Sequence, residues 1–306
     1  MTPILHSVSY AGVWPGQTRL TLDAFLDKAA ELGFRGVMLM AKRPHLSVLD
    51  YPSDACLRLR EKLEARGLRC HVIAGYNNFS ADLEHGDVPH REFQIQHVTE
   101  LARMARDLGA AVVRIFTSYE HAAMGYAPLW KLTVESIREC ARRAADYAVT
   151  IGVQNHHDLA AHYESHRDLI QDIGEPNCRA MFDAWSPALH GSDIVAAARL
   201  MAPLTCHTTI ADYQRRPRFR YHPNVVNYTE EPAWAQAVPM GEGFIDYPGF
   251  LGALREGGYD GAVAYEMCSP LRGGGEIENL DRYARRFLEF MQRSGFAAPS
   301  PAAHRA

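Results

Sequence analysis

Polar and ionisable residues lie at or near the ends of four successive apolar segments in the second half of this 306-residue chain. Gln154 ends TIGVQ, Asp183 ends AMFD and Glu266 ends AYE, while His207 lies within LTCHTTI. Amide, carboxylate and imidazole groups all coordinate divalent cations, and carboxylates also move protons. If these segments are neighbouring strands that end at one rim, their side chains converge on a single site.

Two carboxylates buried at one site need charge compensation. Burying Asp183 beside Glu266 without a cation would force one of them to take up a proton. A divalent ion removes this conflict, and a mixed oxygen and nitrogen donor set suits Mn²⁺, Mg²⁺, Co²⁺ or Zn²⁺. A hydrogen-bonded polar cluster without a metal is the alternative that the residues leave open.

Other polar and aromatic residues near these segments are candidates for substrate contacts. His156 and His157 follow Gln154 directly, and strand alternation favours His156 as the residue that faces the site. Either histidine is a candidate second acid, and a supporting contact to a ligand is the alternative. Tyr10 and Trp14 follow the first apolar run, where they are candidates for an apolar wall beside a sugar ring.

Two further residues have a functional and a structural interpretation. His71 lies within the third apolar run and is either a substrate contact or a histidine of the barrel core. Asp212 follows His207 by five residues and either orients that imidazole or caps a loop.

Short apolar segments alternate with longer amphipathic ones along the chain. The short runs predict buried strands at residues 4–9, 36–40, 68–74, 112–116, 150–154, 179–183, 204–210 and 261–266. Helical periodicity predicts helices at residues 22–32, 54–65, 91–108, 132–147, 167–173, 193–201, 247–255 and 277–293. Glycines that can stop a helix in the left-handed conformation follow five of them: Gly33, Gly67, Gly109, Gly174 and Gly257. Eight such units with right-handed crossovers predict an α/β fold, a single (β/α)₈ TIM barrel. A doubly wound open sheet is the alternative, disfavoured because no Gly-rich phosphate turn follows the first strand.

Three of the predicted strand-to-helix loops are long, at residues 75–90, 117–131 and 212–246. In a barrel these loops build the active-site face. The third, dense in Arg, His, Tyr and Asn over residues 213–239, predicts a lid or rim over the site, or a subunit contact. We expect one barrel domain over residues 1–294 and a disordered, Ala- and Pro-rich tail over residues 295–306.

The composition of the chain argues against nucleic acid and membrane as binding partners. With 47% hydrophobic residues the chain can bury a large core, and its net charge of −4 leaves no basic excess for nucleic acid. No signal peptide and no apolar run of membrane-spanning length is evident. The six cysteines form no C-x-x-C pair, which predicts buried free thiols and a cytoplasmic protein.

The chain resembles the xylose isomerase-like TIM barrel superfamily of sugar phosphate isomerases and epimerases. That group includes ketose 3-epimerases, inosose dehydratases and isomerases, and apurinic-site endonucleases. The resemblance covers roughly residues 4–291 and rests on ELGFRGVML, QNHHD, FDAW, HTTIAD and MGEGFIDYPGFLGALREGGYDGAVAYE. The last of these is the most diagnostic, because a G-x-G-x-x-D turn, a helix and a Gly-Tyr-x-Gly turn lead into a strand that ends in Glu.

The resemblance implies one divalent metal ion, with Mn²⁺ favoured, and four ligands for it: Gln154, Asp183, His207 and Glu266. It also implies that Glu266 is a catalytic base and that Arg215 corresponds to an arginine in the seventh-strand loop that contacts the substrate.

The chain departs from the family pattern at two positions, and both departures argue against an epimerase mechanism with two symmetric carboxylates. The family usually has Glu where this chain has Gln154, and an amide oxygen can bind a metal but cannot take a proton. The epimerases often have His where this chain has Ser186.

The function expected is a metal-dependent isomerase or epimerase of a keto-sugar or cyclitol, which removes a proton next to a metal-bound carbonyl to form an enediolate. The first alternative is a lyase or dehydratase that eliminates water or a glycosyl group from a keto-sugar. The second is a non-catalytic subunit that binds metal and sugar. An endonuclease would need more His and Asp ligands and a basic groove. The expected partner is a small, non-phosphorylated sugar or cyclitol, and a dimer or tetramer is the assembly typical of relatives.

Overall fold

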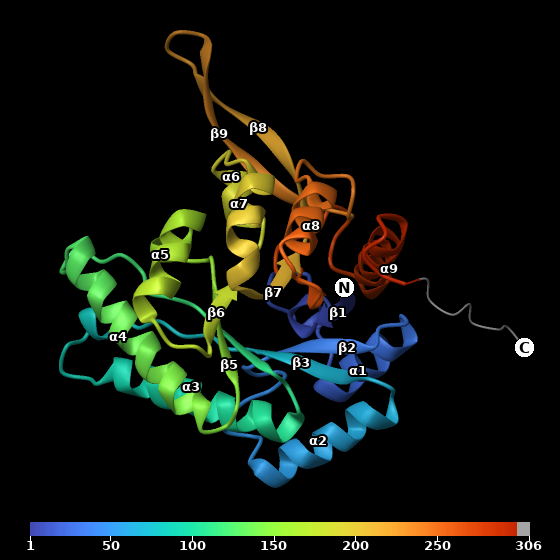
Figure 1. Cartoon of the computed structure of the whole chain (residues 1–306). Helices are drawn as coiled ribbons and strands as arrows, with labels where there is room; N and C mark the ends of the chain where they lie inside the picture. Colours follow the sequence, from blue (N-terminus) through green and yellow to red (C-terminus); the bar gives the residue numbers. More distant parts are fainter. Residues whose placement is uncertain (299–306) are drawn as a thin grey trace, which may run out of the picture.

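Eight parallel strands close into a barrel in the computed structural model, which describes residues 1–298 (Figure 1). The strands are β1 (Thr2–His6), β2 (Gly36–Met40), β3 (Arg69–Ala74), β4 (Val112–Ile115), β5 (Thr150–Gln154), β6 (Cys178–Met181), β7 (Thr205–Ile210) and β10 (Ala262–Tyr265). They lie around the barrel in chain order, and Ile4 opposite Ala264 closes it between β1 and β10. The predicted (β/α)₈ fold is therefore confirmed.

The helices lie outside the strands (Figure 1). They are α1 (Leu22–Glu31), α2 (Ser53–Ala65), α3 (His90–Leu108), α4 (Tyr126–Ala145), α5 (Tyr163–Ile173), α6 (Trp185–Leu189), α7 (Ile194–Met201), α8 (Tyr247–Glu256) and α9 (Ile277–Arg293). Their apolar faces and the outer faces of the strands form one large core. A second cluster fills the barrel interior and consists of Ile4, Met38, Val72, Ala74, Val112, Met181 and Ala264. This packed interior leaves the ends of the strands as the place for a site.

Left-handed glycines follow four of the five helices for which they were predicted. Positive φ angles occur at Gly33, Gly67, Gly109 and Gly174. Gly257 instead has a φ of −82°, and Gly258 takes the left-handed conformation at 94°. Gly257 is required for another reason, since a Cβ there would clash with the Cβ of Ala202.

The long segment after β7 is a two-stranded antiparallel hairpin of β8 (Asp212–His222) and β9 (Asn227–Val238). Figure 1 shows this hairpin projecting away from the barrel rather than folding across its mouth. Its base is buried at Tyr213 and Val238, whereas Phe219 and Trp234 further out are exposed. The prediction of a lid over residues 213–239 is thus wrong for most of the segment, because its strands pair with each other and not with the barrel.

The first part of the predicted tail belongs to the barrel. Phe296 is buried, and the guanidinium of Arg255 lies 4.8 Å from the centre of its ring. The rest of the predicted tail, residues 299–306, lies outside the described residues. Among the residues described, no helix combines the length and the apolar character that a membrane span requires.

All six cysteines are free thiols. Cys56, Cys70, Cys140 and Cys178 are buried as predicted, and Cys206 is half-buried. Cys268 departs from the prediction, because it is exposed at the cavity described below.

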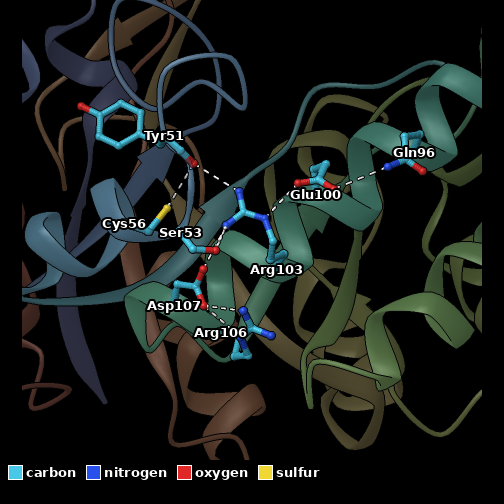
Figure 2. Close-up of polar contacts among 8 residues, drawn as sticks. All are labelled: Tyr51, Ser53, Cys56, Gln96, Glu100, Arg103, Arg106 and Asp107. Atoms are coloured by element: carbon cyan, nitrogen blue, oxygen red, sulfur yellow. Dashed lines mark hydrogen bonds and ion pairs between the residues drawn. The ribbon is translucent and has the colours of Figure 1, made fainter.

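A charged network joins the start of α2 to α3 (Figure 2). Arg103 donates hydrogen bonds to the hydroxyl of Ser53 (2.8 Å), the carbonyl of Tyr51 (3.2 Å) and the carboxylates of Glu100 and Asp107 (both 2.9 Å). Burial acts to raise the pKa of Asp107, but hydrogen bonds from Arg106 and Ser53 and the neighbouring guanidinium charges outweigh it and lower that pKa. Through this network, the single side chain of Arg103 links the start of α2 to α3.

Candidate active site

A cavity of about 570 Å³ opens at the C-terminal ends of the barrel strands. Gln154 at the end of β5, Asp183 after β6, Thr209 near the end of β7 and Glu266 after β10 all line it. This is the rim where the sequence predicted that strand-ending residues would meet. The volume matches that of pockets for small organic ligands.

Asp183 is buried, and its carboxylate is surrounded by hydrogen-bond donors. Its Oδ2 accepts from Gln154 Nε2 (2.8 Å) and Thr209 Oγ1 (3.3 Å), and its Oδ1 accepts from the Trp185 amide (3.2 Å). Burial, with the negative charge of Glu266 adding to it, raises the pKa of Asp183 to about 7 although the hydrogen bonds act to lower it. Asp183 can therefore both hold and release a proton near neutral pH.

Asn155 fixes the position of Asp183 where the strand ladder ends. Its Nδ2 donates to the Asp183 carbonyl (2.9 Å), and its Oδ1 accepts from the Asp183 amide (2.8 Å). Ser186 adds a hydrogen bond from its hydroxyl to the Asn155 carbonyl (3.1 Å). The sequence analysis did not identify Asn155, although its place directly after a strand-ending amide was a signal that could have marked it.

Glu266 faces the cavity with 15% of its side chain exposed. Its Oε1 lies 3.5 Å from His6 Nε2 and 4.0 Å from a terminal nitrogen of Arg114. The Nδ1 of His6 accepts a hydrogen bond from the Val8 amide (3.1 Å), which places the imidazole proton on Nε2, toward Glu266. Burial and the charge of Arg114 lower the pKa of His6 well below its usual value, so this imidazole is neutral.

Arg114 on β4 is a fully buried arginine beneath the cavity. Its guanidinium carbon lies 4.1 Å from the ring centre of Phe116 and 4.8 Å from that of Tyr76, and both rings line the cavity. None of its three side-chain nitrogens has a hydrogen-bond partner among the described residues. The ring of Tyr76 also contacts Lys42, whose Nζ lies 4.2 Å from the ring centre. Burial and the charge of Arg114 lower the pKa of Lys42.

His156 and His157 both line the cavity, although strand alternation predicted that one would face it. His157 has a φ of 59°, which interrupts the alternation and is strained for a residue with a side chain. Its Nε2 lies 2.8 Å from the Tyr119 hydroxyl, and its amide donates to His156 Nδ1 (2.9 Å). Burial first, and then the charge of Arg114, lowers the pKa of His156 to about 4, while burial and His156 lower that of His157 to about 3.

His207 does not line the cavity. It lies opposite Met181 in the β6–β7 ladder, and burial together with the nearby charge of His71 lowers its pKa to about 3. Thr209 is two residues further along β7, on the same face, and reaches Asp183. A hydroxyl therefore occupies the position at the cavity for which the resemblance implies an imidazole.

The metal centre implied by the resemblance does not fit the side chains present. Within residues 1–298, no three His, Cys, Asp or Glu side chains are grouped so that they could hold a metal ion. Two carboxylates reach the cavity, and the other two positions carry the weaker donors Gln154 and Thr209. Both oxygens of Asp183 already accept hydrogen bonds.

Three of the predicted substrate contacts lie away from the cavity. Tyr10 is buried, and its hydroxyl donates to Asp281 (2.9 Å). Trp14 is buried in the large core. His71 packs against Gly36, where an added Cβ would lie 2.5 Å from its ring. None of the three is among the residues that line the cavity.

Asp212 and Arg215 stabilise the base of the hairpin. The Oδ2 of Asp212 accepts from the amides of Gly241 and Gly243 (both 2.9 Å), so it holds a loop rather than the imidazole of His207. Arg215 donates to the Ala188 carbonyl (2.8 Å) and also lies outside the cavity lining.

Comparison with solved structures shows the same fold in several proteins. D-psicose 3-epimerase from Clostridium cellulolyticum H10, solved with D-tagatose, is 18% identical, with a TM-score of 0.74 over 96% of this chain and 99% of its own. The probable 3-DHS dehydratase AsbF from Bacillus anthracis is 18% identical, with a TM-score of 0.71 over 94% and 99%. The IolI protein, solved with a bound zinc atom, is 16% identical, with a TM-score of 0.72 over 98% and 100%.

No curated protein gives a significant match to the sequence. The model of one protein family, described as the xylose isomerase-like TIM barrel, matches residues 26–293. Because that match spans most of the chain and the barrel is closed as the family name requires, the chain belongs to the xylose isomerase-like TIM barrel family.

Proposed function

We propose that this protein is an enzyme that moves a proton at the carbon next to a carbonyl group of a keto-sugar or cyclitol, and so isomerises or epimerises it. The observation that carries the proposal is the pair of carboxylates at one cavity in two different environments. Glu266 faces a guanidinium and an imidazole N–H, whereas Asp183 is buried among neutral donors. Two such groups divide naturally into a base and an acid.

Glu266 is the base in this mechanism. Its carboxylate takes the proton from the α carbon, the C–H electron pair forms a carbon–carbon double bond, and the carbonyl electron pair moves onto oxygen. The product is an enediolate, whose negative charge is stabilised by fixed donors and charges around the cavity. The neutral imidazoles of His156 and His157 are available there as hydrogen-bond partners, not as cationic acids, because their pKa values are lowered to about 4 and about 3.

The fate of the proton defines the reaction. Return from Glu266 to the neighbouring carbon gives isomerisation, and delivery from Asp183 to the opposite face gives epimerisation. Asp183 has a pKa of about 7, which suits a group that must give and recover a proton in each turnover.

Elimination is the second candidate reaction, and the acid that favours it is again Asp183. A protonated Asp183 can donate to a leaving hydroxyl on the β carbon while Glu266 holds the α proton. Water then departs and an unsaturated carbonyl compound is left. The barrel similarity to a probable dehydratase agrees with this alternative but shows the fold alone.

Solvent deuterium incorporation separates these outcomes. The protein is incubated in D₂O with keto-sugars, inososes and 3-keto-glycosides, and the products are followed by NMR and mass spectrometry. Deuterium at the α carbon of an intact sugar is expected, and Glu266→Gln should abolish it. Glu289→Gln, an exposed carboxylate on α9, is the matched control. Loss of water or of the aglycone would identify a lyase, and ligand binding without any exchange would identify a binding subunit and overturn the proposal.

A further inference from the structure

The polar groups around Asp183 are those that solvate a carboxylate. Gln154 and Thr209 direct an amide N–H and a hydroxyl toward the same oxygen, Oδ2, and the Trp185 amide is directed toward the other. A metal ligand needs a free lone pair aimed at the ion and companion ligands that are also acceptors. Around Asp183, three neighbours act as donors instead.

The polar groups around Glu266 also leave little place for a cation. Arg114 lies 4.0 Å from Glu266 Oε1, so an ion bound to that oxygen would lie close to a guanidinium that cannot lose its charge. His6 presents an N–H to the same oxygen, because its other nitrogen accepts from the Val8 amide. An imidazole in that tautomer has no lone pair for a metal on the side that faces the site.

Arg114 has the properties of a resident positive charge. A fully buried guanidinium with no hydrogen-bond partner is costly, and such a group calls for an explanation. Aromatic faces of Phe116 and Tyr76 hold it in place beneath the cavity, and the nearest acid is Glu266. The charge is thus fixed by packing next to Glu266 and against two rings that line the cavity.

We propose that this active site works without a divalent metal ion, and that the guanidinium of Arg114 supplies the fixed positive charge beside Glu266 that stabilises the anion formed on the substrate. The catalytic part of this proposal rests on the proton-transfer function proposed above. Its metal-binding part does not depend on any substrate. Arg114 lies under the cavity lining and acts largely through Glu266, so it is a positioning residue.

Metal binding is tested first, on the full-length protein. Metal content after purification is measured by mass spectrometry, and Mn²⁺ and Zn²⁺ are titrated by calorimetry into chelator-treated protein. We expect no stoichiometric metal and no saturable binding in the wild-type protein. The double variant Gln154→Glu, Thr209→His, which completes a set of three acids and an imidazole, should gain one binding site. One tightly bound ion per wild-type chain, lost in Asp183→Asn, would overturn the proposal.

The charge of Arg114 is tested by three matched proteins. Arg114→Met removes the charge and keeps a long, unbranched side chain, while Arg114→Lys keeps the charge. The first should lower the deuterium exchange rate by about tenfold or more and change its pH profile, with chelator having no effect on the wild-type rate. The second should retain part of the rate and a profile close to that of the wild type. Equal rates and profiles in wild type and Arg114→Met would overturn the role of Arg114.

The two proposals fail in different ways. Absence of exchange on every substrate would refute the proton-transfer function while the metal titration still decides whether an ion binds. Exchange that stops on adding chelator and returns with Mn²⁺ would support the function and refute the metal-independent site.

Discussion

Gln154 donates a hydrogen bond of 2.8 Å from its amide nitrogen to the Asp183 carboxylate, across the ends of β5 and β6. A carboxylate in place of this amide would meet Asp183 with like charge. We therefore expect Gln154→Glu to lower the free energy of unfolding by about 1–3 kcal/mol at neutral pH and by less in acid, where the two groups share a proton. Urea unfolding at both pH values measures the difference.

The control for that experiment is Gln154→Met, which removes the hydrogen bond without adding charge. It should be destabilising to a similar degree at both pH values. A Gln154→Glu protein that is as stable as the wild type in the presence of chelator would contradict the hydrogen-bond assignment.

Asp183 should make the protein less stable as pH rises. Its pKa is raised from 3.8 to about 7 by burial, with Glu266 adding to the effect, so the folded state holds a proton that the unfolded state has released. Between those two values, the unfolded state binds fewer protons and the free energy of unfolding falls with increasing pH. Asp183→Asn should flatten this part of the stability curve, measured by urea unfolding from acid to neutral pH. A slope that is unchanged in the variant would show that Asp183 titrates normally.

His156 and His157 should stay neutral throughout the range in which an ordinary histidine titrates. Their pKa values are lowered to about 4 and about 3, chiefly by burial. The unfolded chain takes up these protons near pH 6.5 and the folded protein does not, so their contribution to stability is lost as pH falls from that value toward 4. NMR titration, with signals assigned from His156→Gln and His157→Gln, checks the prediction. A midpoint near 6.5 for either residue would contradict it.

The fold followed from the sequence because buried strands and amphipathic helices have different periods. Each barrel strand overlaps a predicted apolar run, and the closed order of strands is the one that right-handed crossovers require. The hairpin of β8 and β9 was missed because it lacks this periodic signal. Most of its residues are exposed on both faces, so no apolar alternation marks them.

The site followed from the sequence only where a polar residue closes an apolar run. Gln154, Asp183 and Glu266 were found in this way, and they do meet at the cavity. Arg114 was missed because it lies inside the run VVRIF, although a lone charge in a buried strand is itself unusual. Thr209 was missed because an imidazole, His207, lies two residues earlier on the same face of the strand. Only the depth of each residue in the barrel decides that Thr209 and not His207 reaches the cavity.

Arg103 should contribute strongly to stability although it does not line the cavity. Arg103→Met removes its hydrogen bonds to the Tyr51 carbonyl and to Ser53, Glu100 and Asp107 (Figure 2). We expect a loss of about 1–3 kcal/mol, because two of these partners tie α3 to the start of α2. Thermal and urea unfolding measure it.

Arg60→Met is the matched control for Arg103. Arg60 also lies on a helix, but within residues 1–298 its one ion pair is with the exposed Glu64 four residues on. Exposed pairs of this kind contribute about 0.3–0.5 kcal/mol. Similar losses in the two variants would mean that the network adds no more than a surface ion pair.

The outer part of the hairpin should be dispensable for the barrel and for its chemistry. Replacing residues 217–233 with a short Gly-Ser turn removes the exposed Phe219 and Tyr221 and keeps the buried base. A two-stranded ribbon that stands away from the core adds little stability of its own. We therefore expect an unchanged melting temperature and unchanged deuterium exchange. Light scattering on the same protein tests the subunit contact that the sequence suggested, since a hairpin that joins two chains would leave a monomer when shortened.

The base of the hairpin should behave differently. Tyr213 lines the cavity and stacks on Trp185, with ring centres 4.4 Å apart and planes at 12°. Tyr213→Ala should lower exchange through a higher KM, because it removes one wall of the cavity while Glu266 and Asp183 keep their partners. If shortening the outer hairpin abolished exchange while Tyr213→Ala left it intact, the projecting arm and not its base would be the part that serves the site.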